Sequence, residues 1–270
     1  MGDKSKIAWT DATWNPWIGC HNVSEECRRC YARTDVNRKF GPRGYDFDKP
    51  WRAKTTLRKP LKWNREAVEF EKLNGRRFRA FTSSWTDFFL AEADEWRNEA
   101  WDVIRECHYM DFLILTKRPS RVLDCLPADW GQGWSHVWLG TTCGVRHSYP
   151  RLDALRKIPA TVRFISAEPL LESMADIDLT GFHWLIAGGE SGSGFRKMED
   201  AWAVELKDKC AAEGVGFFFK QHSSFRPGQG EILEGREYHE APLVQIVDTG
   251  LATSGYHHHE VECDQPDPKL

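Results

Sequence analysis

Residues 162–169 read Val-Arg-Phe-Ile-Ser-Ala-Glu-Pro, a short, mainly apolar run that ends abruptly in small and polar residues. The same pattern recurs along the chain on both sides of this run. Each run has the length of a strand, and its nearly continuous apolar character is typical of a sheet buried on both faces. We predict seven strands of this kind, at residues 13–18, 78–82, 112–116, 137–140, 162–165, 184–187 and 215–219.

Helix-like stretches alternate with these strands. Apolar residues recur at a period near 3.6 over residues 91–108, and shorter helices are predicted at 118–126, 149–157 and 199–213. This alternation predicts parallel strands joined by right-handed crossovers. The expected fold is α/β, a partial (β/α)6-type TIM-like barrel, with a doubly wound open sheet as the alternative. In both folds ligands bind at the carboxyl ends of the strands.

The chain of 270 residues is expected to form one domain over residues 1–242, followed by a polar, flexible tail at 243–270. Residues 39–77 interrupt the alternation, and we interpret them as a basic insertion. No uncharged apolar run approaches 18 residues, and the N-terminus lacks an apolar signal core. We therefore expect a cytoplasmic protein with no membrane partner.

The formal net charge of −3 is unevenly distributed. Residues 28–79 hold 17 Lys and Arg against 6 Asp and Glu, a balance of +11, which leaves −14 for the remaining residues. Such asymmetry suggests a polyanionic partner, with a solvated basic segment as the alternative. Aromatic residues in the same segment can stack on bases, so nucleic acid is favoured. These aromatic residues are Phe40, Tyr45, Phe47, Trp51 and Trp63, and the arginines expected to support DNA binding are Arg76, Arg77 and Arg79.

Three of the eight cysteines, Cys20, Cys27 and Cys30, crowd into a C-x6-C-x2-C arrangement. The x2 spacing places two thiolates within one turn of chain, where both can bind one metal centre. Three thiolates without a local fourth suit a four-iron cluster with one open iron. Structural zinc needs four ligands, so the zinc alternative requires a distant residue such as Cys143, His147 or Cys263. Ordinary free thiols are a third alternative.

The residues around these cysteines resemble a known signature. Asn-Pro-Trp-Ile-Gly-Cys at 15–20 and Cys-Arg-Arg-Cys-Tyr-Ala-Arg at 27–33 are similar to the cysteine motif of radical S-adenosylmethionine (SAM) enzymes, in the branch of spore photoproduct lyase. The first loop is three residues longer than the common C-x3-C-x2-C spacing. The chain to about residue 225 also resembles a phage- and prophage-associated family of three-cysteine proteins. Residues 138–142, 165–171, 187–192 and 218–221 carry that second resemblance.

The resemblance implies a [4Fe-4S] cluster bound by Cys20, Cys27 and Cys30, with SAM as the second cofactor. An electron from an external donor would cleave SAM, and the resulting radical would abstract a hydrogen atom from the substrate. The implied substrate is a nucleic-acid base, DNA favoured, or a nucleotide, in DNA modification or DNA repair. No oligomeric state is predicted.

The remaining site residues follow from the needs of SAM at the strand ends. Seven residues are expected to bind its amino, carboxylate and ribose groups: Ser83, Ser84, Asp87, Lys117, Thr141, Ser166 and Glu168. Glu190, in Gly-Gly-Glu at 188–190, is a candidate for contact with methionine or substrate, and Cys143 is a candidate hydrogen-atom donor. The alternatives are a solvated turn for Glu190, a structural carboxylate for Glu168, surface charges for Lys117 and Lys220, and an inert buried thiol for Cys143.

Two further function classes stay open on the sequence. One is a zinc-stabilised nucleic-acid-binding module without radical chemistry. The other is a non-radical barrel enzyme, such as a base-exchanging glycosylase, that uses Asp87, Glu168 or Glu190.

Overall fold

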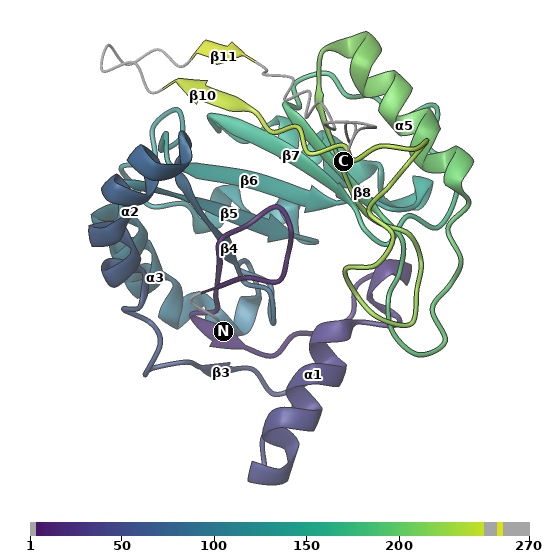
Figure 1. Cartoon of the computed structure of the whole chain (residues 1–270). Helices are drawn as coiled ribbons and strands as arrows, with labels where there is room; N and C mark the ends of the chain where they lie inside the picture. The colour runs from purple at the N-terminus through teal and green to yellow at the C-terminus, as the bar shows by residue number, and fades with distance from the viewer. Residues whose placement is uncertain (1–3, 246–252, 256–270) are drawn as a thin grey trace, which may run out of the picture.

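The central feature of the fold is a curled, seven-stranded parallel sheet that forms a half-barrel (Figure 1). The structure is a computed structural model, which describes residues 4–245 and 253–255. The strands lie in the order β1-β4-β5-β6-β7-β8-β9, so each strand pairs with the next one of the sheet along the chain. This order is that of a partial barrel and excludes the doubly wound alternative, in which the strand order reverses. The strands are β1 Ala12–Trp14, β4 Phe78–Thr82, β5 Met110–Thr116, β6 Val137–Thr142, β7 Val162–Ala167, β8 Trp184–Gly188 and β9 Gly216–Gln221.

Two separate cores flank the sheet. Ile114, Leu139 and Leu185 point from the sheet into the larger core, which the helices cover. Alternate residues, such as Leu113 and Trp138, belong to a second core on the concave inner face, together with several other aromatic residues. The inner core fills the half-barrel and leaves the carboxyl ends of the strands for polar groups. The helices are α1 Tyr31–Phe40, α2 Pro60–Asn74, α3 Asp94–Glu106, α4 Pro150–Arg156 and α5 Asp200–Glu213.

The predicted first strand, 13–18, is divided between two sheets. Its first part is β1, and its second part, β2 Trp17–Ile18, pairs antiparallel with the short β3 Trp51–Arg52. Pro16 lies between them and has no backbone N–H to donate to a ladder. This division turns the chain out of the barrel immediately before Cys20.

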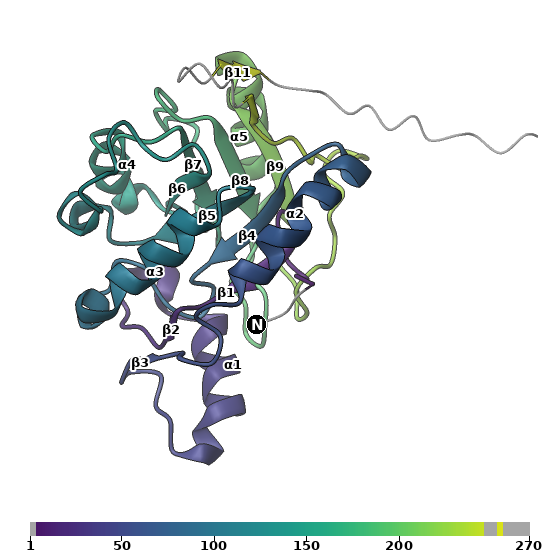
Figure 2. The ribbon, with the colours of Figure 1, turned by 90° about the vertical axis from the view of Figure 1, so that its left-hand side faces the viewer.

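The basic insertion is shorter than predicted. Helix α2 lies within 39–77, yet it packs on β4, β5 and α3 and buries Trp63 and Ala67. It is therefore the crossover helix that leads from β1 to β4. Within 39–77, only the residues before α2 lie outside the barrel, and we call residues 41–59, between α1 and α2, the excursion. Helix α1 and β3 project beyond the sheet at the bottom of Figures 1 and 2.

The prediction of one helix at 118–126 is also wrong. Residues Pro119–Arg121 and Leu123–Cys125 form two separate 3-10 turns, η4 and η5. The stretch is short and is enclosed by Pro119 and Pro127, and the hydroxyl of Thr116 accepts a hydrogen bond from Arg118 N (2.9 Å). The other 3-10 turns are η1 Glu25–Cys27, η2 Gly41–Arg43, η3 Ala91–Ala93 and η6 Arg146–Ser148.

The tail contains two strands that the sequence analysis does not predict. Strands β10 Leu243–Gln245 and β11 Thr253–Gly255 pair antiparallel in a separate ribbon. The rest of the predicted flexible tail, and Cys263 with it, lies outside the described residues. None of the helices in the described part of the chain has the length and apolar character needed to span a membrane.

Candidate functional site

Polar side chains from neighbouring strands meet at the carboxyl end of the sheet. Thr116 Oγ1 at the end of β5 donates to Asp87 Oδ1, which lies beyond β4 (2.7 Å). Lys117 Nζ donates to Thr142 Oγ1 at the end of β6 (3.1 Å), and Thr141 Oγ1 donates to the Thr116 carbonyl (2.8 Å). These contacts join three strand ends into one polar surface, as parallel packing predicts.

The three cysteines lie on a loop between β2 and α1. Cys20 N donates to the Phe47 carbonyl (3.0 Å), Cys27 ends η1, and Cys30 is the N-cap residue of α1. Cys20 and Cys30 both pack against one small core, which contains Ile18, Ala32, Val36, Phe47 and Ala53. We call this the loop core. All three thiols are partly exposed, and none of the described cysteines forms a disulfide.

Two glutamates hold the longer-than-usual loop in place. Glu26 is buried and accepts hydrogen bonds from Ser148 Oγ (2.6 Å) and Arg151 Nη1 (3.2 Å), both beyond β6. Burial opposes ionisation of Glu26, but the hydrogen bond from Ser148 and the charge of Arg151 outweigh it and lower its pKa. Glu25 pairs with Arg196 (2.6 Å). The extra residues of the C-x6-C spacing therefore fasten the loop to the barrel.

Arg118 connects the cysteine loop with the strand ends. Its Nη1 donates to Cys20 Sγ (3.5 Å) and to Asp87 Oδ2 (3.0 Å), and its Nη2 donates to the His21 carbonyl (2.9 Å). Burial raises the pKa of the Cys20 thiol to about 11, and the Asp87 charge adds to this while Arg118 opposes it. A bound metal would instead lower the pKa of Cys20, because a thiol that ligates a metal loses its proton.

Asp87 is fully engaged by protein donors. Besides Thr116 and Arg118, it accepts hydrogen bonds from Phe89 N (3.0 Å) and Lys117 N (2.9 Å). Four bonds match the acceptor capacity of an ionised carboxylate. In this arrangement Asp87 orients Arg118 toward Cys20 and has no position left for a ligand.

Ser83 presents a different case at the end of β4. It has a positive φ of 74°, a conformation that non-glycine residues seldom adopt, and its buried hydroxyl has no hydrogen-bond partner among the described residues. Ser84 Oγ, by contrast, accepts a hydrogen bond from Asn15 Nδ2 (2.9 Å), and Tyr31 OH donates to the Ser84 carbonyl (2.9 Å). A buried, unpartnered hydroxyl at a strand end is the feature here that most favours a bound ligand.

Glu168 forms an ion pair at the far side of the same surface. Its Oε1 lies 2.7 Å from Lys220 Nζ, and Ser166 Oγ donates to its Oε2 (3.3 Å). A Cβ atom at Gly188 would come within 3.1 Å of that carboxylate, so the glycine leaves the room that Glu168 occupies. Lys220 is therefore part of the polar surface rather than an isolated surface charge.

Glu190 is not a solvated acid. It is buried, and both of its oxygens accept hydrogen bonds from Arg196, at 2.5 Å from Nη2 and 3.0 Å from Nε. Burial opposes ionisation, yet the hydrogen bonds from Arg196 prevail and lower the pKa of Glu190. Since Arg196 also binds Glu25, this pair forms the second attachment of the cysteine loop.

Cys143 lies in the core between the sheet and the helices. It is completely buried, donates to the Val145 carbonyl (3.7 Å), and has a pKa raised to about 12 by burial. This position favours the inert buried thiol over the hydrogen-atom donor.

The three arginines expected to support DNA binding lie at the start of β4, at the opposite end of the sheet. Arg76 pairs with Asp11 (2.7 Å) and Arg77 with Asp111 (2.7 Å). Arg79 lies over the ring of Trp138 at 5.0 Å in the inner core, where burial lowers its pKa to about 10. Arg76 and Arg77 are thus paired and Arg79 is buried within the fold, and their support of DNA binding stays a prediction.

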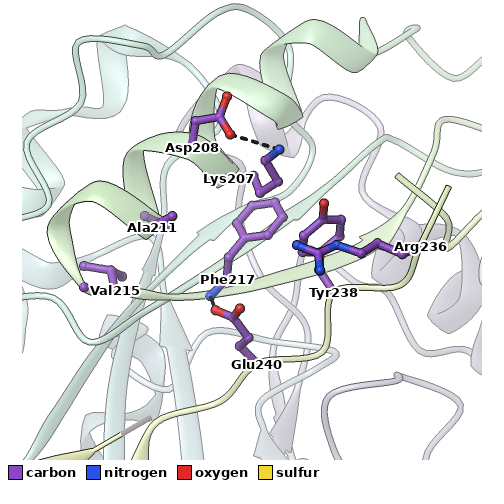
Figure 3. A pocket seen from close by; sticks show the side chains of 10 residues that line it. Lys207, Asp208, Ala211, Val215, Phe217, Arg236, Tyr238 and Glu240 are labelled. Carbon is purple, nitrogen blue, oxygen red and sulfur yellow. Dashed lines mark hydrogen bonds and ion pairs between the residues drawn. The ribbon is translucent and has the colours of Figure 1, made fainter. Parts of the chain in front are cut away.

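A cavity of about 280 Å³ lies away from this surface, between α5 and the start of β9 (Figure 3). Figure 3 shows Phe217, Tyr238 and Arg236 around it, with Lys207 above. None of the predicted site residues lines it.

Within residues 4–245 and 253–255, no three His, Cys, Asp or Glu side chains are gathered as for a single metal ion. A four-iron cluster holds its three thiolates farther apart, because each one ligates a different iron. The donor set suits such a cluster, since it offers three partly exposed thiols and an Arg118 N–H directed at one of them.

The candidate site contains contact residues that sequence reasoning missed. Arg118, Glu26, Arg196 and Tyr31 each contact the cysteine loop or the strand ends. Arg118 directly follows the predicted Lys117, so its place at a strand end was a usable signal. The other three become visible only once distant segments are brought together.

Comparison with known families places the chain in one group. The model of the family DUF5131, described as a protein of unknown function, matches residues 4–249. No curated protein and no solved structure matches the chain.

Proposed function

Since the chain belongs to the DUF5131 family, whose function is unknown, we propose from its own site that it is a radical SAM enzyme acting on a nucleic-acid base. The observation that carries this proposal is the attachment of the three-cysteine loop to the carboxyl ends of the strands. The loop residue Glu26 is bound by Ser148 and Arg151 beyond β6, and the loop residue Cys20 is bound by Arg118 beyond β5. A redox centre on this loop would lie at the end of the barrel where ligands bind.

Cys20, Cys27 and Cys30 would hold a [4Fe-4S] cluster. When bound, such a cluster takes an electron from an external donor and supplies it for the cleavage of SAM. With a cluster bound, the N–H of Arg118 would stabilise the Cys20 thiolate and so influence the iron that this thiolate ligates. Asp87 keeps Arg118 in that orientation.

The strand ends supply complementary groups for SAM. Lys117, half-buried beside Thr142, offers a cation to the carboxylate of SAM. The unpartnered hydroxyl of Ser83 offers a hydrogen bond, and the Glu168 carboxylate offers acceptors to ribose hydroxyls. The aromatic inner core fills the barrel below and excludes water from that side.

The two alternatives fit the site less well. A non-radical enzyme needs a carboxylate that can exchange a proton, whereas Asp87, Glu168 and Glu190 are each paired with Arg118, Lys220 and Arg196 respectively. A zinc module needs four closed ligands, and no further cysteine or histidine completes a site with the three cysteines in the described chain.

The test is anaerobic reconstitution with iron and sulfide. We expect about four irons per chain, and reduction should then convert SAM to methionine and 5′-deoxyadenosine. Cys20→Ala, Cys27→Ala and Cys30→Ala should each lose most of the iron and all SAM cleavage. Cys125→Ala is the matched control, because Cys125 is also partly exposed but lies outside the loop. Stoichiometric zinc without iron would contradict the proposal and favour the zinc module.

A further inference from the structure

Four aromatic side chains form a partly exposed cluster beside the cysteine loop. Phe40 ends α1, Tyr45 and Trp51 lie in the excursion, and Trp85 follows β4. The ring centroid of Phe40 lies 6.1 Å from that of Tyr45, 5.8 Å from Trp51 and 6.0 Å from Trp85. The rings of Tyr45 and Trp51 lie 4.6 Å apart. We call these four residues the aromatic platform.

The platform differs from the other aromatic residues of the basic segment. Phe47 and Trp63 are buried, with 2% and 3% of their surface exposed, and they serve as core. Tyr45 is 45% exposed, and Trp51 remains partly accessible. Tyr45 is therefore an exposed ring, with the partly exposed rings of Phe40 and Trp51 beside it.

Positive charge surrounds the platform. Lys39 Nζ lies 5.3 Å from the ring of Phe40 and 5.0 Å from that of Trp85. Residues 38–54 contain six Lys and Arg against two Asp, a balance of +4. Four of these cations are exposed and form no ion pair within the described residues, and they are Lys39, Arg43, Lys49 and Lys54.

The platform also adjoins the cysteine site. Phe40, Trp51 and Trp85 pack against the loop core, the same core against which Cys20 and Cys30 pack. Gly19 N, next to Cys20, donates to the Trp85 carbonyl (3.1 Å). A ligand on these rings would therefore lie next to the proposed reaction centre.

We propose that the aromatic platform binds single-stranded DNA by stacking its unpaired bases, while the neighbouring cations bind its phosphates. This inference rests on the proposed function and specifies the form of its substrate. Stacked bases inside a duplex cannot lie on protein rings, and the enzyme must expose a base before it can react with it. The combination of accessible rings and unpaired cations is the chemistry that recognises a single strand rather than a protein surface.

The test measures the binding of a short fluorescein-labelled oligodeoxythymidine by fluorescence anisotropy. Tyr45→Ala and Trp51→Ala should each weaken binding about ten-fold or more, and Trp51→Phe should retain most of the affinity. Tyr109→Ala is the matched control, since Tyr109 is 48% exposed but lies at the opposite end of the sheet. Melting temperature measured on each variant identifies any loss of fold.

Charge variants and competitors complete the test. Lys49→Gln should weaken binding and reduce the dependence of log affinity on log salt concentration by about one unit. Equally tight binding of duplex DNA, or binding of RNA alone, would contradict the proposal that single-stranded DNA is the ligand. Unchanged affinity in both Tyr45→Ala and Trp51→Ala would show that the aromatic platform does not bind the oligonucleotide.

Iron content, measured on the same samples, separates the two proposals. A protein that holds iron and cleaves SAM but binds the oligonucleotide independently of Tyr45 and Trp51 disproves the platform alone. A protein that holds no iron but binds through Trp51 disproves the radical SAM proposal and leaves a single-strand-binding surface.

Discussion

At the scale of single residues, the geometry of the site depends on side chains that orient other side chains through ion pairs and hydrogen bonds. Asp87 holds Arg118, Arg118 contacts Cys20, and Arg196 links Glu190 with Glu25. Buried charges of this kind are costly unless their partners are well placed, so each pair fixes one geometry. The acids Asp87, Glu190 and Glu25 therefore act here mainly by positioning other side chains.

Glu190→Gln tests the buried pair with Arg196. We expect a loss of about 2 kcal/mol in the free energy of unfolding at neutral pH, because hydrogen bonds to a charged partner are lost. The pKa of Glu190 is lowered in the fold, so its contribution is present above the ordinary value near 4.5 and is lost as the pH falls through the folded value. Urea unfolding from about pH 7 down to about pH 4 should show the difference between wild type and variant shrinking. A difference that stays constant or grows in acid would contradict this assignment.

At the scale of elements, the cysteine loop is the most informative segment. Its extra length compared with the common spacing could suggest a slack loop, yet η1 places Glu26 in a buried pocket beyond β6. The extra residues between Cys20 and Cys27 thus attach the loop to the barrel. The sequence contains the two adjacent glutamates but no sign of their partners, which lie more than a hundred residues away.

Glu26→Ala tests this attachment. Without its bonds to Ser148 and Arg151 the loop should open more often, and trypsin should cleave after Arg28 and Arg29 several-fold faster, because cleavage needs local unfolding. Mass spectrometry of timed digests identifies the cleaved bonds. Glu95→Ala, an exposed position in the first turn of α3, should leave the pattern unchanged. Equal cleavage rates in the two variants would show that Glu26 does not hold the loop.

The sequence predicts the strands well and the connections poorly, for physical reasons. Buried parallel strands such as β5 and β6 are continuous apolar runs with sharp polar ends, a pattern that is visible locally. By contrast, α2 has the polar composition of a solvated segment, with three Lys and Arg against three Glu, and is defined only by the face, with Trp63, that it packs on the sheet. The turns at 119–125 are likewise determined by Pro119 and by side-chain bonds to a strand end, which helical periodicity does not reveal.

At the scale of the whole molecule, the half-barrel is held from within by close packing of its inner face. Gly140 in β6 lies against the ring of Phe164 in the neighbouring β7. Any side chain at this position would have to displace that ring. Inner faces of small barrels commonly alternate large and small residues in this way.

Gly140→Ala tests the packing. Its added methyl group would come within 2.3 Å of the Phe164 ring, so the free energy of unfolding should fall by about 1–3 kcal/mol. Gly41→Ala is the control, because nothing lies within 4 Å of its Cβ position and its φ of −53° suits alanine. Chemical denaturation of both variants measures the effect, and a neutral Gly140→Ala would show that the inner face is looser than described.

The sequence also predicts where the site lies better than what each residue does there. The strand-end rule gathers Ser83, Lys117 and Glu168 on one surface, because it depends only on topology. It does not reveal that Asp87 is saturated or that Cys143 faces the helices, since both depend on side-chain orientation. For the same reason the accessible rings of the platform could not be separated from the buried Phe47 by composition alone.

The attachment of the cysteine loop has a consequence for the maturation of the protein. All three thiols are synthesised more than a hundred residues before the side chains that support their loop, which are Ser148, Arg151 and Arg196. The nascent chain therefore displays its three clustered thiols before the scaffold that orders their loop has been made. Under the proposed function, the cluster would be loaded only after the barrel has folded.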